Sequence, residues 1–251
     1  MSVVARATGK ATTTHEPGLV KTLLTRVVRQ LANVASILGL LPLCFLFVSD
    51  GFQYLIPFIV YNNFMDDLDG ALAAKLNIRS RFGANLDNVA DAIAHTAIVM
   101  IVGMHYGGLC AVASVMAAAA IVIRGVARLD PAAIKGFGSP TNELIRHVFF
   151  ILLVSELVGI EARHFLVAAF ALHTVSMLMQ QRLPWLLRSL TTRARSVALL
   201  NLVLALAWLV PWTTLPIAIA FVGSYLWSLV VATTAWLRVS LKRPVIAQAL
   251  D

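Results

Sequence analysis

Eight apolar runs, each close to the length of a membrane span, constrain the fold of this 251-residue chain more than any other feature. A helix needs about 20 mostly apolar residues to cross the hydrocarbon core of a bilayer. The chain is 59% hydrophobic and only 13% charged, whereas soluble domains are about a quarter charged. The sequence therefore predicts an all-α, polytopic membrane bundle of about eight transmembrane helices. The runs cover residues 32–49, 52–76, 83–105, 107–127, 143–160, 162–180, 195–212 and 214–237, with Pro211 and a short Trp-Thr-Thr turn between the last two.

The basic residues indicate which side of the membrane each connection faces. If the N-terminus is cytoplasmic, all of the 20 Lys and Arg residues except Arg163 fall on the cytoplasmic side. Cytoplasmic loops carry such an excess of positive charge, which also favours contact with anionic lipids. The net charge of +8 is thus explained by membrane topology, and no nucleic-acid partner is expected.

Three regions are expected along the chain: a basic N-terminal arm over 1–30, a transmembrane domain over 31–240 and a cytoplasmic tail over 241–251. Leucines and valines alternate with basic residues over 17–30, a pattern typical of an amphipathic helix lying on the cytoplasmic surface. A simple solvated basic arm accounts for the same residues.

Five carboxylates lie within the second and third apolar runs, where acidic residues are costly and usually mark function, and four of them form two regularly spaced pairs. Asp66 and Asp69 are three residues apart, and Asp87 and Asp91 are four apart, so each pair lies on one helix face. The two helices are antiparallel with a turn near Asn77–Ser80. At about 1.5 Å per residue, the pairs reach matching depths in the cytoplasmic half of the membrane. We therefore expect all four carboxylates to converge on one site.

Divalent cations are the natural counter-charge for this cluster, because neither span carries a Lys or Arg at that depth. Oxygen ligands suit Mg²⁺ or Mn²⁺, which also bridge substrate phosphates, and four carboxylates fit a pair of ions better than a single ion. The neighbouring Asp67 points about 100° away on a helical wheel and is left out of the ligand set. Small residues share the acidic faces and would let a ligand approach the backbone; these are Gly70, Ala73 and Gly83.

The segment 66–91 also resembles the signature of the CDP-alcohol phosphotransferase (CDP-alcohol phosphatidyltransferase) family, D-x2-D-G-x2-A-R-x8-G-x3-D-x3-D. Asp66, Asp69, Gly70, Ala73, Gly83, Asp87 and Asp91 fall in register with it. One position departs, because Ala74 stands where the motif has an arginine, and Lys75 is rotated from it by one helical step.

The resemblance implies a phospholipid-synthesis transferase that moves a phosphatidyl group from CDP-diacylglycerol to a small alcohol and releases CMP. It implies a six-helix core with two added helices, and a homodimer. It also implies that Asp66, Asp69 and Asp87 bind metal, and that Asp91 is the catalytic base and touches a second ion.

Within the family, SRFGANLDNVAD at 80–91, RGVARLD at 124–130 and GFGSPT at 136–141 most resemble the integral-membrane phosphatidylserine synthase branch of bacteria. The branch implies L-serine as acceptor and a location in the bacterial cytoplasmic (inner) membrane. Arg124 and Arg128, four residues apart, are candidates to bind donor phosphate or the acceptor carboxylate. Ordinary positive-inside anchors are the equal alternative for these two arginines.

Other acceptors stay open: glycerol 3-phosphate, inositol phosphate and choline. Outside this chemistry, intramembrane aspartates also line ion pathways, so a cation transporter is an alternative. The acidic cluster occurs once, whereas transporters more often show repeats in both halves. A non-catalytic membrane protein is the third alternative, for which Ala74 is the only sign.

Overall fold

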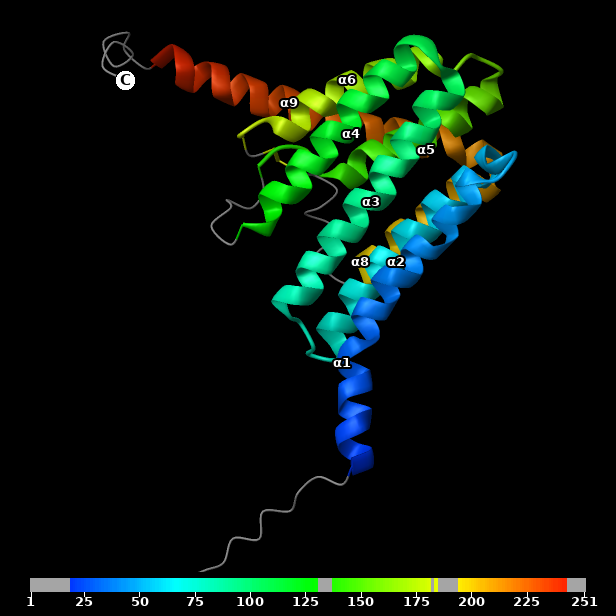
Figure 1. The fold of residues 1–251 in the computed structure, drawn as a ribbon. Helices are drawn as coiled ribbons and strands as arrows, with labels where there is room; N and C mark the ends of the chain where they lie inside the picture. Colours follow the sequence, from blue (N-terminus) through cyan, green and yellow to red (C-terminus); the bar gives the residue numbers. More distant parts are fainter. Residues whose placement is uncertain (1–18, 131–136, 182, 185–193, 243–251) are drawn as a thin grey trace, which may run out of the picture.

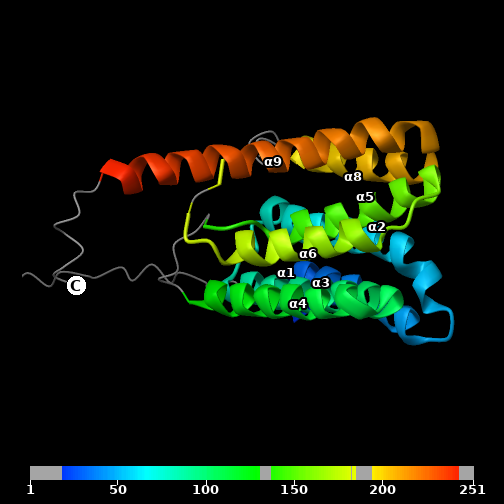
Figure 2. The same ribbon diagram turned by 90° about the horizontal axis from the view of Figure 1, so that it is seen from above.

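A computed structural model describes the chain except for residues 1–18, 131–136, 182, 185–193 and 243–251. The described residues form α-helices and two short 3₁₀ helices, with no β-strand among them. Figures 1 and 2 show the helices packed side by side as a bundle. This confirms the predicted all-α membrane bundle. The helices are α1 (Leu19–Leu40), η1 (Leu41–Phe47), η2 (Gly51–Tyr54), α2 (Leu55–Lys75), α3 (Arg81–Tyr106), α4 (Gly108–Leu129), α5 (Thr141–Val158), α6 (Arg163–Leu178), α8 (Ala194–Leu209) and α9 (Pro211–Lys242).

The first predicted span is broken near its end. The α-helix stops at Leu40 and continues as the tighter helix η1, with Pro42 at its start. Proline has no backbone N–H and its ring clashes with the preceding turn, so a regular α-helix does not pass through it unchanged. The span predicted over 32–49 agrees with the apolar segment Gln30–Phe47, but its second half is a 3₁₀ helix and not a continuation of the α-helix.

The turn between α2 and α3 lies where the sequence predicted it. Asn77 adopts a left-handed conformation with φ of 53°, and the Ser80 side chain accepts a hydrogen bond from the Gly83 backbone N–H at 2.9 Å. Serine is a favoured N-cap because its oxygen satisfies an otherwise unpaired donor of the first turn. Cap and turn together fix where α3 begins, and hence the depth of the aspartates it carries.

Helices α3 and α4 form a hairpin and pack closely against each other. A Cβ added at Gly103 would stand 1.9 Å from Ser114 Oγ, so only glycine permits this approach. Farther along, the Asn88 side chain of α3 donates to the Gly125 carbonyl of α4 at 2.8 Å. Small residues and interhelical hydrogen bonds of this kind hold membrane helices together, because lipid supplies no hydrophobic drive between them.

The two C-terminal helices pack on the rest of the bundle, α8 against α2 and α9 against α5. The helical structure is interrupted at Val210, and Pro211 is the first residue of α9. Proline is favoured at a helix start because its missing N–H would have no partner there. The predicted Trp-Thr-Thr turn was wrong, since Trp212, Thr213 and Thr214 form the first turn of α9.

Within the described residues, four segments are long and apolar enough to span a membrane on their own: Gln30–Phe47, Arg81–Tyr106, Gly108–Leu129 and Pro211–Arg238. Helices α6 and α8 are apolar but shorter. The predicted amphipathic stretch over 17–30 lies partly in α1, which begins at Leu19 and runs into the first span without a break. Residues 1–18 of the arm and 243–251 of the tail lie outside the described part of the chain.

Candidate active site

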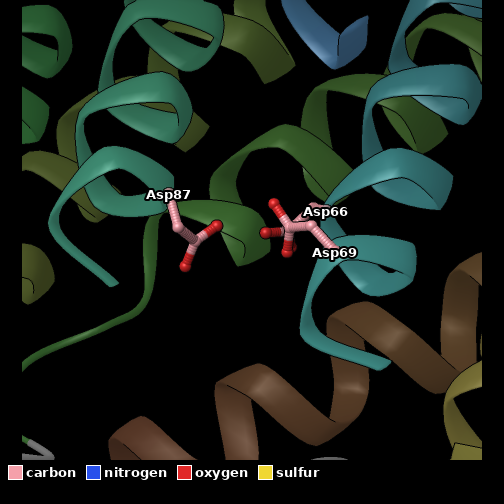
Figure 3. A group of neighbouring side chains, drawn as sticks. All are labelled: Asp66, Asp69 and Asp87. Atoms are coloured by element: carbon pink, nitrogen blue, oxygen red, sulfur yellow. The ribbon is translucent and has the colours of Figure 1, made fainter. Parts of the chain in front are cut away.

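Three of the predicted carboxylates meet between α2 and α3. One oxygen atom from each of Asp66, Asp69 and Asp87 lies within 4.8 Å of the others. Figure 3 shows Asp87 reaching from α3 toward the two aspartates of α2. The i, i+3 spacing on α2 and the antiparallel turn produce this arrangement, as predicted from the sequence.

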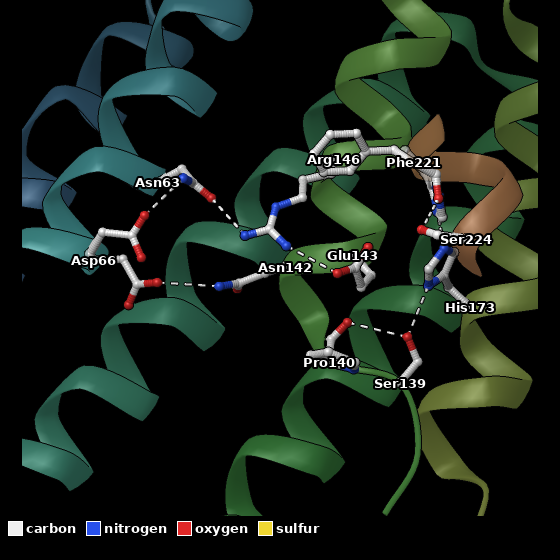
Figure 4. A network of polar contacts seen from close by, with 12 residues as sticks. Asn63, Asp66, Ser139, Pro140, Asn142, Glu143, Arg146, His173, Phe221 and Ser224 are labelled. Carbon is white, nitrogen blue, oxygen red and sulfur yellow. Dashed lines mark hydrogen bonds and ion pairs between the residues drawn. The ribbon is translucent and has the colours of Figure 1, made fainter. Parts of the chain in front are cut away.

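Side chains from α1 and α5 orient two of these carboxylates. The buried Ser36 of α1 donates a short hydrogen bond to Asp69 Oδ2. Asn142 of α5 donates from Nδ2 to Asp66 Oδ2 at 3.2 Å (Figure 4). Neither partner was predicted, because each lies far along the chain from the acidic segment and its contact depends on helix packing.

Asp91, one helical turn after Asp87 on α3, lies outside the group of three and lines two small pockets. The first, which we call the amide pocket, lies between α2, α3 and α5. It is lined by Ile59, Asn62, Asn63, Asp66, Asp91, His95, Asn142 and Ile145. The second, the arginine pocket, lies between α3, α4 and the start of α5. It is lined by Asn88, Asp91, Ala92, Ile121, Arg124, Gly125, Arg128 and Thr141.

Asp67 turns away from the group, as expected from the helical wheel. Its Oδ2 accepts hydrogen bonds from Asn201 Nδ2 of α8 at 2.5 Å and from Asn63 Nδ2 at 3.4 Å. These bonds draw the side chain toward α8, away from Asp87.

The three clustered carboxylates fit a divalent metal ion. They offer oxygen atoms from two helices at mutual distances that one ion or a close pair could bridge. Like charges so close in a low-dielectric interior repel strongly unless protons or cations compensate them. A hard cation such as Mg²⁺ or Mn²⁺ is the compensation that this donor set suits best.

The small residues of the motif differ in their surroundings. A Cβ added at the exposed Gly70 would meet nothing within 4 Å, so this face of α2 is open beside the carboxylates. Ala73 is partly exposed one turn farther on. At Gly83 an added Cβ would stand 3.1 Å from Asn33 Oδ1 and 3.2 Å from Ser80 Oγ. The space at Gly83 is therefore used by helix packing against α1.

The two predicted arginines also differ. Arg124 is buried, and its Nη1 donates to the carbonyls of Phe137 at 2.7 Å and Met177 at 3.1 Å. Its Nη2 donates to the Gly138 carbonyl at 3.4 Å, so the guanidinium ties α4 to the loop before α5 and to the end of α6. Arg128, one turn later, is exposed and lines the arginine pocket.

A buried ion pair on α5 was not predicted from the sequence. Arg146 Nη1 donates to Glu143 Oε1 at 3.0 Å, and the two side chains are only 13% and 7% exposed. Arg146 Nη2 also donates to Asn63 Oδ1 at 3.4 Å, which brings a guanidinium close to the acidic segment (Figure 4). Because Glu143 pairs with it, Arg146 adds little net charge there.

A histidine cluster inside the bundle was also missed, since these histidines are scattered in sequence. It comprises His147, His173, Tyr225 and the serines Ser139 and Ser176, from α5, α6, α9 and the loop before α5. His147 Nδ1 and His173 Nε2 lie 2.6 Å apart, and His173 stacks on Tyr225 with ring centroids at 4.4 Å. His95 belongs to neither group. It is buried, and its Nδ1 lies 2.9 Å from Thr141 Oγ1 beside both pockets.

Comparison with known proteins identifies the family to which the chain belongs. A sequence model of CDP-alcohol phosphatidyltransferases matches residues 29–175, which is more than half of the chain. The chain belongs to the CDP-alcohol phosphatidyltransferase family. No curated protein matches it. The matched region contains α2 and α3 with all the clustered aspartates, whereas α8 and α9 lie beyond it.

Membership confirms the coarser predictions. The CDP-alcohol phosphatidyltransferase family consists of transferases of substituted phosphate groups in phospholipid synthesis, acting on a CDP-linked donor and an alcohol. Together with the apolar helices, it identifies the chain as an integral membrane protein. The serine synthase branch, the acceptor and the roles of individual residues are not distinguished by the family match.

Proposed function

We propose that this CDP-alcohol phosphatidyltransferase transfers the phosphatidyl group of CDP-diacylglycerol to L-serine at the cytoplasmic side of a bacterial inner membrane. The observation that carries the proposal is the group formed by Asp66, Asp69 and Asp87, with Asp91 beside it at the junction of two pockets. The positive-inside distribution of Lys and Arg supports the cytoplasmic side. A homodimer stays a prediction from the family resemblance.

In this proposal Asp66, Asp69 and Asp87 hold Mg²⁺ or Mn²⁺ against the donor diphosphate. Bound metal supplies charge neutralisation on the diphosphate and on the departing CMP. The open side of α2 at Gly70 and Ala73 gives the nucleotide a path to the carboxylates, since an added Cβ at Gly70 meets no other atom. Ser36 and Asn142 keep two of the ligands oriented through their hydrogen bonds.

Asp91 is the proposed general base and would also help to hold a second ion. The acceptor hydroxyl oxygen forms a bond to the phosphorus of the phosphatidyl group, and its proton passes to the Asp91 carboxylate. The bond between this phosphorus and the CMP oxygen breaks, and CMP leaves with the electron pair. A positioned base of this kind contributes about 10²- to 10⁴-fold to the rate.

Serine is the acceptor that the two pockets favour. Asp91 lines both pockets. A serine molecule with its hydroxyl beside Asp91 can place its carboxylate near the exposed Arg128 in the arginine pocket. The rest of the molecule then lies near the uncharged amides of Asn62 and Asn142 in the amide pocket. A guanidinium is a good partner for a carboxylate. Arg124 is a weaker candidate because three backbone carbonyls already engage it.

The test is CMP release by purified protein in lipid or detergent, supplied with CDP-diacylglycerol and Mn²⁺ or Mg²⁺. Serine, glycerol 3-phosphate, inositol phosphate and choline are compared in parallel, with Asp91→Asn as the inactive control. Metal-dependent release with serine, about 100-fold or more above the control, is expected. Release with another acceptor would overturn the serine assignment, and no release with any acceptor or metal would overturn the proposed activity.

A further inference from the structure

Helix α8 reaches the active-site helix through one polar side chain. From Val197 to Leu209 every residue of α8 is apolar except Asn201. Its Nδ2 donates to Asp67 Oδ2 at 2.5 Å, and its Oδ1 accepts from Asn63 Nδ2 at 2.8 Å. Both amide atoms are thus engaged with α2.

The partners of Asn201 flank the first proposed metal ligand. Asn63 lies one helical turn before Asp66, and Asp67 is the residue directly after Asp66. The two hydrogen bonds of Asn201, one with Asn63 and one with Asp67, restrain both the rotation and the axial position of the turn of α2 that carries Asp66. A ligand aspartate needs such restraint, because metal affinity depends on how well its oxygens are already oriented.

The restraint continues into α5. Asn63 Oδ1 accepts from Arg146 Nη2 at 3.4 Å, and Arg146 is held in turn by Glu143. Asn142 of the same helix donates to Asp66 itself. The turn of α2 that carries Asp66 is therefore held from α8 on one side and from α5 on the other.

We infer that Asn201 is a positioning residue of the active site, which makes α8 part of the catalytic machinery although it lies outside the family-matched region. Asn201 acts through Asp67 and Asn63 on the orientation of Asp66 and hence on metal binding. This inference rests on the proposed metal-binding role of Asp66, but it does not depend on the acceptor or on turnover.

The expected effect follows from the strength of interhelical hydrogen bonds in membranes. Such bonds average about 0.6 kcal/mol and reach about 1.7, which corresponds to about 3- to 18-fold in a binding constant. Asn201→Leu keeps a side chain of similar size but removes both hydrogen bonds. We expect this variant to bind Mn²⁺ about 3- to 18-fold more weakly than the wild type.

The matched control is Leu204→Ala, on the same helix and 2% exposed in the wild type. This change opens a cavity in the packing of α8 and leaves the polar contacts of α2 in place. It should lower the unfolding temperature while Mn²⁺ affinity stays within about twofold of wild type. Asn201→Ala serves as a second variant if Asn201→Leu does not fold, with the same expected weakening.

The experiment is a Mn²⁺ titration of each purified variant in lipid nanodiscs, followed by the electron paramagnetic resonance signal of free Mn²⁺. Weaker binding in the Asn201 variants alone supports the inference. Wild-type affinity in those variants, or equal weakening in Leu204→Ala, would overturn it. A wild type that binds no Mn²⁺ would overturn it together with the metal site. Mn²⁺ binding without CMP release would overturn only the proposed activity.

Discussion

Two polar clusters lie inside this bundle, and they are satisfied in different ways. The aspartates between α2 and α3 bring together several groups of one charge, with oxygen atoms within 4.8 Å. The histidine cluster between α5, α6 and α9 consists of groups that can all be neutral, and most of their polar atoms have partners within the cluster, although the buried His147 Nε2 has no hydrogen-bond partner. Ser176 Oγ and Tyr225 OH lie 2.7 Å apart, and His173 Nδ1 lies 3.5 Å from Ser139 Oγ.

The difference distinguishes a ligand site from a structural core. A neutral network whose members hydrogen-bond to one another needs no counter-charge from outside. A group of carboxylates cannot do so, because its members only accept hydrogen bonds when ionised. Polar residues inside a membrane protein are therefore not equally informative. The cluster left with uncompensated charge is the one expected to bind a cation.

The largest expected effect is the loss of metal binding in Asp66→Asn. Mn²⁺ at about 100 times its dissociation constant should stabilise the wild type by about 2.7 kcal/mol, which is about 5–10 °C in unfolding temperature. Asp66→Asn should lose most of this increase, measured by thermal unfolding with and without Mn²⁺. Without metal it should be as stable as wild type or more so, because one repelling charge is removed.

Asp67→Asn is the matched control for that prediction. It removes the same charge one residue along α2, from a carboxylate that faces Asn201 and not Asp87. Because asparagine keeps an oxygen that can accept the hydrogen bond from Asn201, this variant should keep most of the Mn²⁺-dependent increase. Equal loss in both variants would mean that total negative charge, and not the group of three, determines binding.

A smaller effect, on stability alone, is expected in the histidine cluster. His173→Leu leaves His147 Nδ1 without its partner at 2.6 Å, and an unpaired buried polar group costs about 1–3 kcal/mol. The double variant His147→Leu/His173→Leu should recover part of that loss, because removing both partners leaves neither one unpaired. Thermal unfolding measures the first effect, and CMP release at saturating metal should stay within a few-fold. A selective loss of metal affinity in His173→Leu would place this cluster in the active site as well.

The smallest effects are expected from alanine substitutions at the two glycines of the family motif, Gly70 and Gly83. Gly70→Ala should raise helix stability by about 0.5–1 kcal/mol, since its Cβ meets no other atom, yet it should weaken the use of CDP-diacylglycerol. Gly83→Ala should instead destabilise the protein, because its Cβ crowds Asn33 and Ser80. Unfolding temperature and the KM for the donor measure the two effects. An unchanged KM in Gly70→Ala would argue against donor binding on this face.

Local patterns allowed much of this site to be predicted from the sequence. The i, i+3 and i, i+4 aspartate spacings, the turn at Asn77–Ser80 and the outward direction of Asp67 all follow from helix geometry within one hairpin. Helix positions were likewise predictable from apolar length, except where a proline acted locally. Pro42 changes an α-helix to a 3₁₀ helix, whereas Pro211 starts a new helix.

Contacts between distant segments could not be predicted in this way. Ser36, Asn142 and Asn201 reach the acidic segment only because α1, α5 and α8 pack around α2. None of these three residues is a carboxylate in a regularly spaced pair, which is the pattern that identified the aspartates in the sequence.

The most direct test of the metal site is anomalous diffraction from crystals of the protein grown in lipid with MnCl₂. We expect a manganese peak about 2.0–2.3 Å from carboxylate oxygens of Asp66, Asp69 and Asp87, and no such peak in Asp66→Asn crystals. A second peak beside Asp91 is expected if the site holds a pair of ions. Manganese bound elsewhere, or no peak at these aspartates in the wild type, would contradict the assignment of this cluster as the metal centre.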